Sequence, residues 1–277
     1  MVGGIGSRPV FTALGWPGFA DLTLAGLVFL CCAAFLAGAV DAIVGGGGLI
    51  QLPAMLLLVP GGNIIYSLGT NKLAAVAGTT AAAWTYAKRT PVPWRSALPM
   101  AAVAFLGALG GAVFAASLPQ TVLTVVVLVA LVGVGIYTWR KPDLGSVAAP
   151  RFGPVQQTWV MVAGGLVIGF YDGLAGPGTG SFLVFLLVGL VGFAFVGASA
   201  TAKIVNVATN LGALLFFIAA GKILWGLALV MAVSNASGSV LGAALASSRG
   251  SVFVRKVFLT VVVALVASLG WKLASGL

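Results

Sequence analysis

The sequence predicts an all-α polytopic membrane protein built from two related halves. Of the 277 residues, 61% are hydrophobic and only 6% are charged, whereas a soluble domain has about 25% charged residues. The apolar residues form continuous runs, such as TVLTVVVLVALVGVGIYTW, and do not alternate with polar residues as the strands of a membrane barrel do. Because backbone groups in the hydrocarbon core must be bonded within the protein, these runs predict helices.

Ten apolar segments follow one another, and most reach the roughly 20 residues that a helix needs to span a bilayer. We expect an N-terminal segment at 1–20 that is not a cleaved signal peptide, a first repeat at 21–139, a polar linker at 140–157 and a second repeat at 158–277. The expected helical segments are 21–44, 48–59, 64–87, 95–117 and 120–139 in the first repeat, and 158–175, 180–196, 198–220, 223–246 and 253–273 in the second.

The second segment of each repeat is short and begins at a glycine cluster. The clusters are Gly45-Gly46-Gly47-Gly48 in the first repeat and Gly176-Pro177-Gly178-Thr179-Gly180 in the second. Gly and Pro interrupt a helix at membrane depth only where the freed backbone groups are buried in protein or line a cavity. Each short segment is therefore expected to be a broken helix or a re-entrant segment.

One numerical shift relates the two halves. Adding 131 to a residue number carries the first half onto the second, and the chain's few polar and aromatic residues coincide. Two of the four acidic residues match under this shift, which chance explains poorly. The matched pairs are Asp41 with Asp172, Thr70 with Thr201, Lys72 with Lys203, Trp94 with Trp225, and Met100 with Met231.

The relative orientation of the repeats is open at this point. If all ten segments cross the membrane, each repeat has an odd number of spans and the two are inverted. If the short segments are re-entrant, eight spans remain and the repeats are parallel. Lys and Arg divide unevenly between the two sides in both cases, so the positive-inside rule does not choose. We favour inverted repeats, because paired broken helices recur in transporters of that architecture.

Four charged residues lie within or beside apolar segments: Asp41, Lys72, Asp172 and Lys203. A charge at the bilayer centre costs at least about 2.5 kcal/mol, so each must face the interior and find a partner. Two Asp–Lys pairs that fix helix packing are one interpretation. A central site to which both repeats contribute is the other, and we favour it because apolar packing could replace purely structural pairs.

The glycine clusters suggest what such a site binds. A helix N-terminus presents free N–H groups and a partial positive charge, and glycine lets a ligand approach the backbone closely. Two such N-termini with two lysines predict an anion cradle. The candidate coupling residues are Asp41 and Asp172. The candidate substrate-binding residues are Gly45, Gly46, Gly47, Gly48, Gln51, Thr70, Asn71, Lys72, Gly176, Gly178, Thr179, Gly180, Ser181, Thr201, Lys203, Asn206 and Asn210.

Glycines outside the clusters are expected to have a different role. Gly107 and Gly111 match Gly238 and Gly242 under the 131-residue shift, and in each pair the spacing is four residues. Small residues at this spacing allow helices in membranes to pack closely. We therefore interpret these four glycines as packing positions.

Two motifs resemble the TauE/SafE sulfite exporter family, also called the four-span toluene-sulfonate uptake permeases. AGAVDAIVGGGGLIQLPAML followed by GTNKLAAVAGT is similar to the family's first motif, and GFYDGLAGPGTGSFLVFLLV followed by ASATAKIVNVATNLGALLFF to its second. The resemblance implies a multi-pass permease of the bacterial inner membrane for sulfite, organosulfonates or sulfoacetate-like anions. Its motif positions map onto Asp41, Gly45–Gly48, Asn71, Lys72, Asp172, Gly176, Pro177, Gly178, Gly180, Lys203 and Asn206. The 131-residue shift matches Asn71 with position 202, where the second half has Ala202 and not Asn. The two half-sites therefore need not be equivalent.

Other classes of function fit the residues less well. The chain has no His, and its two adjacent Cys lie in an apolar run, so we expect no metal, no cofactor and no enzyme activity. The basic residues are scattered among loops, which does not indicate nucleic acid; the expected partners are a small anion and the lipid bilayer, and the oligomeric state is open. An intramembrane aspartyl protease using Asp41 and Asp172, a scaffold subunit, a passive channel and a transporter of another organic anion remain alternatives. For the two Asp residues, neutralisation of Lys in the empty site and proton coupling are both open.

Overall fold

The structure is a computed structural model that describes residues 22–58, 64–119, 122, 125, 129 and 151–275. Within these residues all regular structure is helical, which confirms the all-α prediction. The predicted segments at 1–20 and 120–139 and the linker residues 140–150 lie outside the described residues, apart from three single positions. The described helices are α1 (Leu24–Val44), α2 (Gly48–Leu58), α3 (Ile64–Ala87), α4 (Trp94–Ser117), α6 (Pro154–Leu174), α7 (Thr179–Phe185), the π-helix η3 (Leu186–Val191), α8 (Phe195–Ala219) and α9 (Trp225–Ser275).

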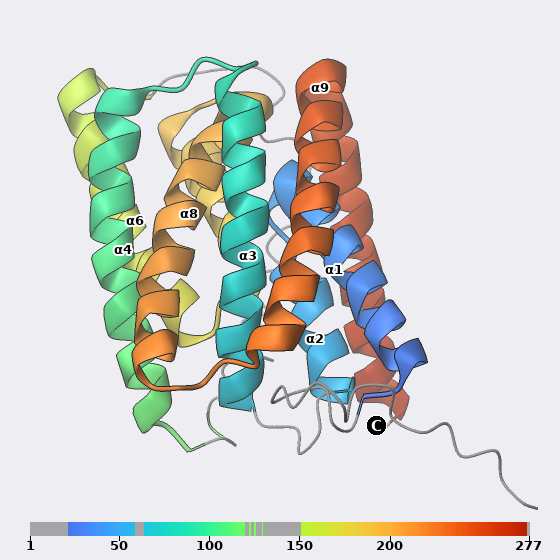
Figure 1. Cartoon of the computed structure of the whole chain (residues 1–277). Helices are drawn as coiled ribbons and strands as arrows, with labels where there is room; N and C mark the ends of the chain where they lie inside the picture. The colour runs from blue at the N-terminus through green and yellow to red at the C-terminus, as the bar shows by residue number, and fades with distance from the viewer. Residues whose placement is uncertain are drawn as a thin grey trace, which may run out of the picture.

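One helix boundary differs from the prediction, and one predicted break is confirmed. Helix α6 begins at Pro154, inside the predicted linker, because Gly153 is extended and Pro at the first helical position needs no N–H partner. The predicted break between residues 246 and 253 is confirmed by Gly250, which divides α9 (Trp225–Ser275) into two arms with the non-helical angles φ 74° and ψ −174°. The chain turns back there, and the second arm of α9 descends to the end of the bundle where the first arm began (Figure 1).

The described helices include four that are long and apolar enough to cross a membrane: α1, α4, α8 and the first arm of α9. Helices α3 and α6 have 24 and 21 residues and are also of spanning length. Helices α2 and α7 are short, as the sequence predicted, and each follows a glycine turn. The turns contain Gly45, Gly176 and Gly178 with positive φ, a conformation that suits glycine.

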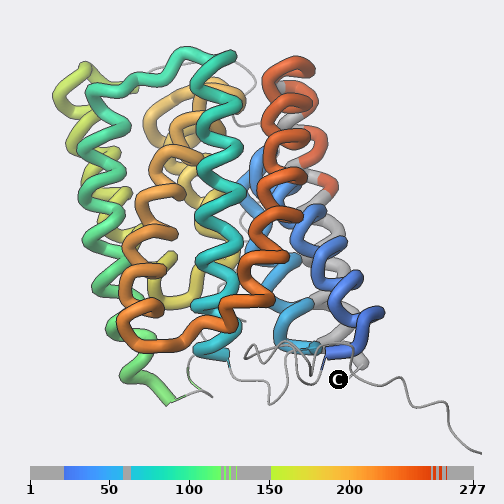
Figure 2. Tube along the Cα trace, in the orientation of Figure 1, coloured from blue at the N-terminus to red at the C-terminus, as the bar shows by residue number. Residues whose placement is uncertain are grey.

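The helices form one upright bundle in which neighbours often come from different halves of the sequence. Helix α4 packs along α6, α1 along α9, and α3 along both α8 and α9. In Figures 1 and 2, α1, α3 and the first arm of α9 run upward, whereas α6, α8 and α4 run downward. Helices matched by the 131-residue shift, such as α3 and α8, thus run in opposite directions.

Close helix packing depends on the four glycines that the sequence singled out. A methyl group added at Gly238 or Gly242 would overlap the backbone carbonyl of Phe35 or Ala39 in α1. In the other half, a methyl group at Gly107 or Gly111 would meet the carbonyl of Leu166 or Phe170 in α6. These contacts confirm the packing interpretation, because a side chain at any of these positions would push the two helices apart.

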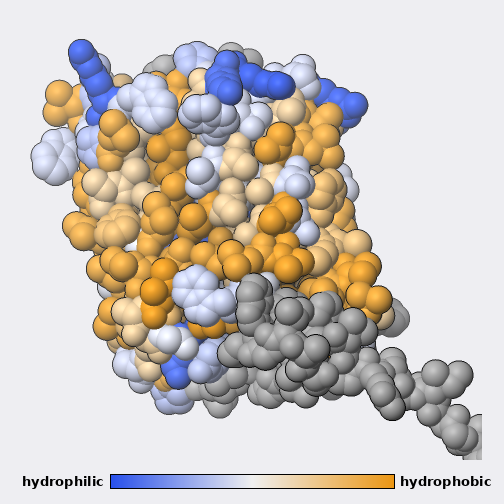
Figure 3. Space-filling model, viewed as in Figure 1, coloured by the Kyte–Doolittle hydropathy of each residue, from blue (hydrophilic) through white to orange (hydrophobic). Residues whose placement is uncertain are grey.

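The surface is consistent with a lipid environment. Large apolar side chains such as Phe29, Leu106, Leu215 and Val233 are exposed, and apolar residues cover the middle of the visible face in Figure 3. Hydrophilic side chains gather mainly at the top of that view. In water these exposed apolar faces would be unfavourable, whereas in a bilayer they contact lipid tails.

Two adjacent glycines in α4 give a matched test of the packing. We expect Gly111→Ala to lower stability by about 1–3 kcal/mol, because the new methyl overlaps the Phe170 carbonyl. Gly110→Ala is the control, since its methyl would lie 4.0 Å from the nearest side-chain atom, in the Phe170 ring. Thermal unfolding of the purified protein in detergent measures both, and equal melting temperatures would contradict the packing model.

Candidate functional site

Two buried ion pairs connect the halves of the sequence. The Lys72 ammonium in α3 lies 2.8 Å from a carboxylate oxygen of Asp172 in α6. The Lys203 ammonium in α8 lies 2.6 Å from a carboxylate oxygen of Asp41 in α1. The two lysines are among the largest fully buried side chains, with exposed fractions of 1% and 0%. Each pair joins one helix of the first half to one of the second, so the pairs cross between the halves.

Additional hydrogen bonds hold each pair in place. The second carboxylate oxygen of Asp41 accepts from the backbone N–H of Gly47 at 3.2 Å, which ties the broken helix α1–α2 to its own ion pair. The Lys72 ammonium also donates to the side-chain oxygen of Asn210 at 3.3 Å. Because Lys can only donate, this bond turns the amide nitrogen of Asn210 away from Lys72.

The two glycine clusters meet at the centre of the bundle. The backbone of Gly45 lies directly against Gly180, and a methyl group on either would overlap the other. The N–H of Ser181 donates to the Gly45 carbonyl at 3.1 Å, and the Ser181 hydroxyl donates to the Val44 carbonyl at 3.0 Å. The broken ends of α1 and α7 are thus bonded to each other, and glycine is required because the backbones touch.

Hydroxyl groups from two further helices bind the carbonyls at the end of α1. The Tyr86 hydroxyl in α3 donates to Ala42 at 2.8 Å, and the Ser199 hydroxyl in α8 donates to Ile43 at 3.1 Å. These bonds satisfy carbonyl groups that a helix C-terminus leaves without an internal partner. Ser199 therefore has a structural role next to the site.

Some backbone N–H groups in and just after the glycine clusters are engaged within the protein. Those of Leu49 and Gln51 donate to the Gly46 and Gly47 carbonyls, and that of Thr179 donates to Gly176. These bonds involve only some of the cluster N–H groups, so the anion cradle expected from the sequence stays a prediction.

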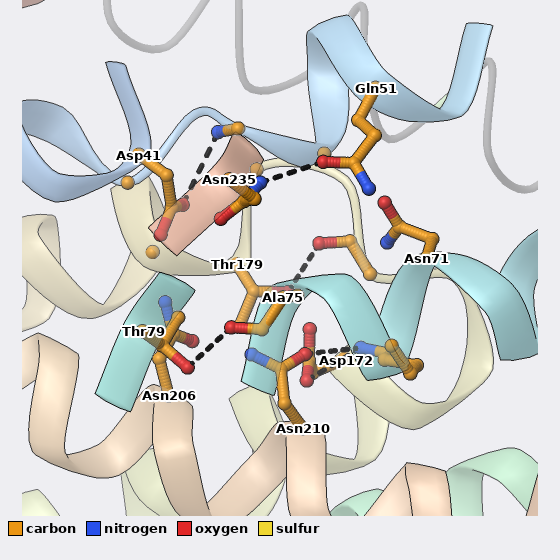
Figure 4. A pocket seen from close by; sticks show the side chains of 17 residues that line it. Asp41, Gln51, Asn71, Ala75, Thr79, Asp172, Thr179, Asn206, Asn210 and Asn235 are labelled. Carbon is orange, nitrogen blue, oxygen red and sulfur yellow. Dashed lines mark hydrogen bonds and ion pairs between the residues drawn. The ribbon is translucent and has the colours of Figure 1, made fainter. Parts of the chain in front are cut away.

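A small cavity of about 40 Å³ lies between the two ion pairs and the glycine clusters (Figure 4). By volume it has room for about three water molecules or one small anion. Most of its lining is polar, with carboxylates, one ammonium group and several amides directed inward. The lining residues are Asp41, Gly45, Gly47, Gly48, Gln51, Asn71, Lys72, Ala75, Thr79, Asp172, Gly176, Gly178, Thr179, Gly180, Asn206, Asn210 and Asn235.

Most candidate residues from the sequence line this cavity, and five do not. Lys203 is paired with Asp41 but is absent from the lining, as is Gly46. Thr70 accepts a hydrogen bond from the Leu224 N–H across to α9, Ser181 binds Val44, and Thr201 donates to Gly197 within α8. Among the described residues, Lys72 is therefore the one cationic side chain that lines the cavity.

Sequence reasoning missed Ala75, Thr79 and Asn235. Ala75 and Thr79 are the positions that match Asn206 and Asn210 under the 131-residue shift, so that shift could have found them. Asn235 matches Ala104 under the shift, so the comparison of the two halves did not single it out. An amide within a segment long and apolar enough to span a membrane was the available indication.

The donor set favours an anion or a neutral polar ligand over a metal ion. Within the described part of the chain no three His, Cys, Asp or Glu side chains lie close enough to hold a metal. Each lining carboxylate already faces a lysine. Within the described residues, the buried side-chain groups of the lining without a hydrogen-bond partner include the amide nitrogen of Gln51, which can donate to a ligand oxygen, and the side-chain oxygen of Asn206, which can accept from a neutral ligand.

The Lys72–Asp172 pair offers a test of buried charge. We expect Lys72→Met to destabilise the protein by about 3–5 kcal/mol, because Asp172 is left as an unpaired buried charge. The double variant Lys72→Met/Asp172→Leu is expected to recover most of that loss. Melting temperatures in detergent measure both variants. A double variant less stable than Lys72→Met would show that the pair is not coupled in this way.

Comparisons with known proteins agree with this arrangement. The model of the family "Sulfite exporter TauE/SafE" matches residues 30–269. A probable membrane transporter protein, ORF9, of Sinorhizobium sp. is 38% identical over 246 residues, covering 88% of this chain and 92% of the relative. The probable membrane transporter protein YfcA of Escherichia coli K12 is 35% identical over 240 residues, covering 86% of each chain. A probable membrane transporter protein of Haemophilus influenzae is 34% identical over 238 residues, covering 85% of this chain and 91% of the relative.

A comparison with the solved structures found no match. The family model spans most of the chain, and the bacterial relatives are similar over nearly their whole length. With the apolar spanning helices and the buried polar centre, these matches show that the chain is a multi-pass membrane transporter of the bacterial inner membrane and belongs to the TauE/SafE family.

Proposed function

We propose that this transporter moves small sulfur-containing oxyanions, such as sulfite, organosulfonates or sulfoacetate, through the central cavity. The observation that carries the proposal is the buried Lys72 ammonium, which lines the cavity together with the amides of Gln51, Asn71, Asn206 and Asn210. A sulfur oxyanion presents several acceptor oxygens and one or two negative charges, which these donors suit. The family description names sulfite, and that description also supports the proposal.

Charge balance supports an anion that binds reversibly. Two lysines and two aspartates around the cavity cancel one another, so the empty site is neutral. An anion that approaches Lys72 competes with Asp172 for the same ammonium group. Binding is then favourable without being so tight that release becomes slow, which transport requires.

We further propose that the halves are inverted repeats and that transport occurs by alternating access. The opposite directions of α3 and α8 support this, as do glycine contacts that correspond under the 131-residue shift. Inverted repeats with broken helices at the membrane midplane can exchange conformations, which opens the site to each side in turn. The contact between Gly45 and Gly180 is then part of a moving interface.

Asp41 and Asp172 are the proposed coupling residues. When an anion binds Lys72, the Asp172 carboxylate loses part of its compensation, and a proton can replace it. Anion and proton would then cross together as a nearly neutral load, which lowers the cost of passage through the membrane.

The aspartyl protease alternative finds no support in the geometry, because such enzymes share a proton between two carboxylates, whereas each carboxylate here faces its own lysine. A different organic anion remains the main alternative substrate.

Anion flux in proteoliposomes tests the function. We expect wild-type protein to move radiolabelled sulfite and an imposed pH gradient to drive accumulation. Asp172→Asn should lose the response to the pH gradient while retaining exchange of sulfite between the two sides. Absence of sulfite and sulfonate flux in the wild type would contradict the substrate assignment, and an unchanged pH response in both Asp41→Asn and Asp172→Asn would contradict proton coupling.

The distribution of basic residues supports one orientation in the membrane. Lys88, Arg89 and Arg95 lie where α3 ends and α4 begins, and Arg151 precedes α6 at the same end of the bundle. The positive-inside rule places this end in the cytoplasm. The last helix ends at Ser275 on the opposite side, which we propose faces the periplasm.

Fusions to the C-terminus test this orientation. We expect alkaline phosphatase fused after Leu277 to be active, because this enzyme requires the oxidising periplasm, and green fluorescent protein at the same place to be dark. The control fuses both reporters after Arg89, where the result should reverse. A fluorescent C-terminal fusion without phosphatase activity would show the opposite orientation.

A further inference from the structure

The cavity has one polar corner whose counterpart under the 131-residue shift has different side chains. Asn235 in α9 donates its amide N–H to the side-chain oxygen of Gln51 in α2 at 2.7 Å. Both side chains line the cavity and are buried, Gln51 with an exposed fraction of 1%. We call this pair, Gln51 and Asn235, the amide clamp.

The amide clamp leaves one strong donor without a partner. The Gln51 oxygen is occupied by Asn235, so its amide nitrogen lies on the other side of the group, and this nitrogen has no hydrogen-bond partner within the described residues. An unsatisfied buried donor costs about 1–3 kcal/mol, a cost that a bound oxyanion would remove. Figure 4 shows the Gln51 amide directed toward Asn71 at this corner of the cavity.

The surroundings of Asn235 fix the orientation of its amide. Its side-chain oxygen lies against Gly78 in α3, where any side chain would overlap it. The Ser239 hydroxyl, one turn further along α9, lies 3.4 Å from the same oxygen and 3.1 Å from the Gly38 carbonyl. With its oxygen held on this side, Asn235 can present only its N–H groups to Gln51.

The 131-residue shift carries this corner onto residues of different chemistry. Gln51 matches Phe182, Gly78 matches Thr209, Asn235 matches Ala104 and Ser239 matches Ala108. The corner combines Gln51 and Gly78 of the first half with Asn235 and Ser239 of the second, and its counterpart lacks an amide donor. The coordinated difference indicates a requirement for a donor at this corner that the opposite corner lacks.

We propose that the Gln51 amide nitrogen is a substrate-binding donor and that Asn235 is the positioning residue that turns it toward the cavity. This inference rests on the proposed function and adds to it: the oxyanion is held between a charged donor, Lys72, and a neutral donor, Gln51. The anion therefore binds off the axis that relates the halves, in one orientation.

Sulfite affinity of the purified full-length protein tests the inference. Gln51→Met keeps the length of the side chain and removes the donor, so it should weaken sulfite binding by about 10- to 100-fold, as expected for a lost hydrogen bond to a charged group. Asn235→Leu should weaken sulfite binding less than Gln51→Met does, because the Gln51 donor is still present but its amide group is free to rotate. Asn235→Asp should weaken it more than Asn235→Leu, since a carboxylate can only accept and turns the Gln51 oxygen toward the cavity.

The double variant Gln51→Met/Asn235→Leu separates positioning from a purely structural role. If Asn235 acts through Gln51, the double variant binds sulfite no more weakly than Gln51→Met alone. The control is Ser237→Ala in the same helix, an exposed residue whose hydroxyl bonds within α9, and its affinity should equal that of the wild type. Melting temperatures identify any variant that is unfolded. If Gln51→Met is unfolded, Gln51→Asn takes its place, because the side chain is one methylene shorter and the donor is withdrawn from the cavity.

Two outcomes would overturn the inference. Wild-type affinity in Gln51→Met, or additive losses in the double variant, would show that the amide clamp does not bind substrate in this way. If the wild type itself binds none of sulfite, methanesulfonate and sulfoacetate, the proposed function fails and the inference with it.

Discussion

The burial of four charges in an apolar bundle is the constraint on which the rest of the structure depends. Neither a lysine nor an aspartate is stable alone in such surroundings, so Lys72 must meet Asp172 and Lys203 must meet Asp41. Because each pair spans the two halves, α1, α3, α6 and α8 have to converge at one point. The glycine clusters make that convergence sterically feasible, since the backbones of Gly45 and Gly180 touch where the broken helices end.

Much of this arrangement could be predicted from the sequence, and the reasons are physical. Long apolar runs specify membrane helices, and the scarcity of charge made Asp41, Lys72, Asp172 and Lys203 conspicuous. Spacing within one chain could not say which lysine meets which aspartate, because the pairing depends on helices far apart in the sequence. The N–H groups of the glycine turns were expected to bind the anion, and a sequence pattern cannot reveal which of them, such as that of Thr179, donate to nearby carbonyls instead. Asn235 was missed because its match, Ala104, is unremarkable.

The two halves contribute unequally to the cavity, and this asymmetry bears on function. Two related halves would give a symmetric site, but Lys72 lines the cavity while Lys203 lies behind it. Amide donors come from both halves without corresponding one to one: Asn71 from the first, Asn206 and Asn210 from the second. A small oxyanion would thus meet one ammonium group and several neutral donors in a neutral cluster, conditions that favour selective and reversible binding.

The most direct test of this account is equilibrium binding of radiolabelled sulfite to two charge-balanced double variants. Lys72→Gln/Asp172→Asn and Lys203→Gln/Asp41→Asn each remove one lysine and one aspartate, so the net charge of the cluster is zero in both. The account predicts that the first variant loses sulfite affinity by about 10- to 100-fold, because its charged donor lined the cavity. The second should retain affinity close to that of the wild type, and equal losses in both variants, or none in the first, would contradict it.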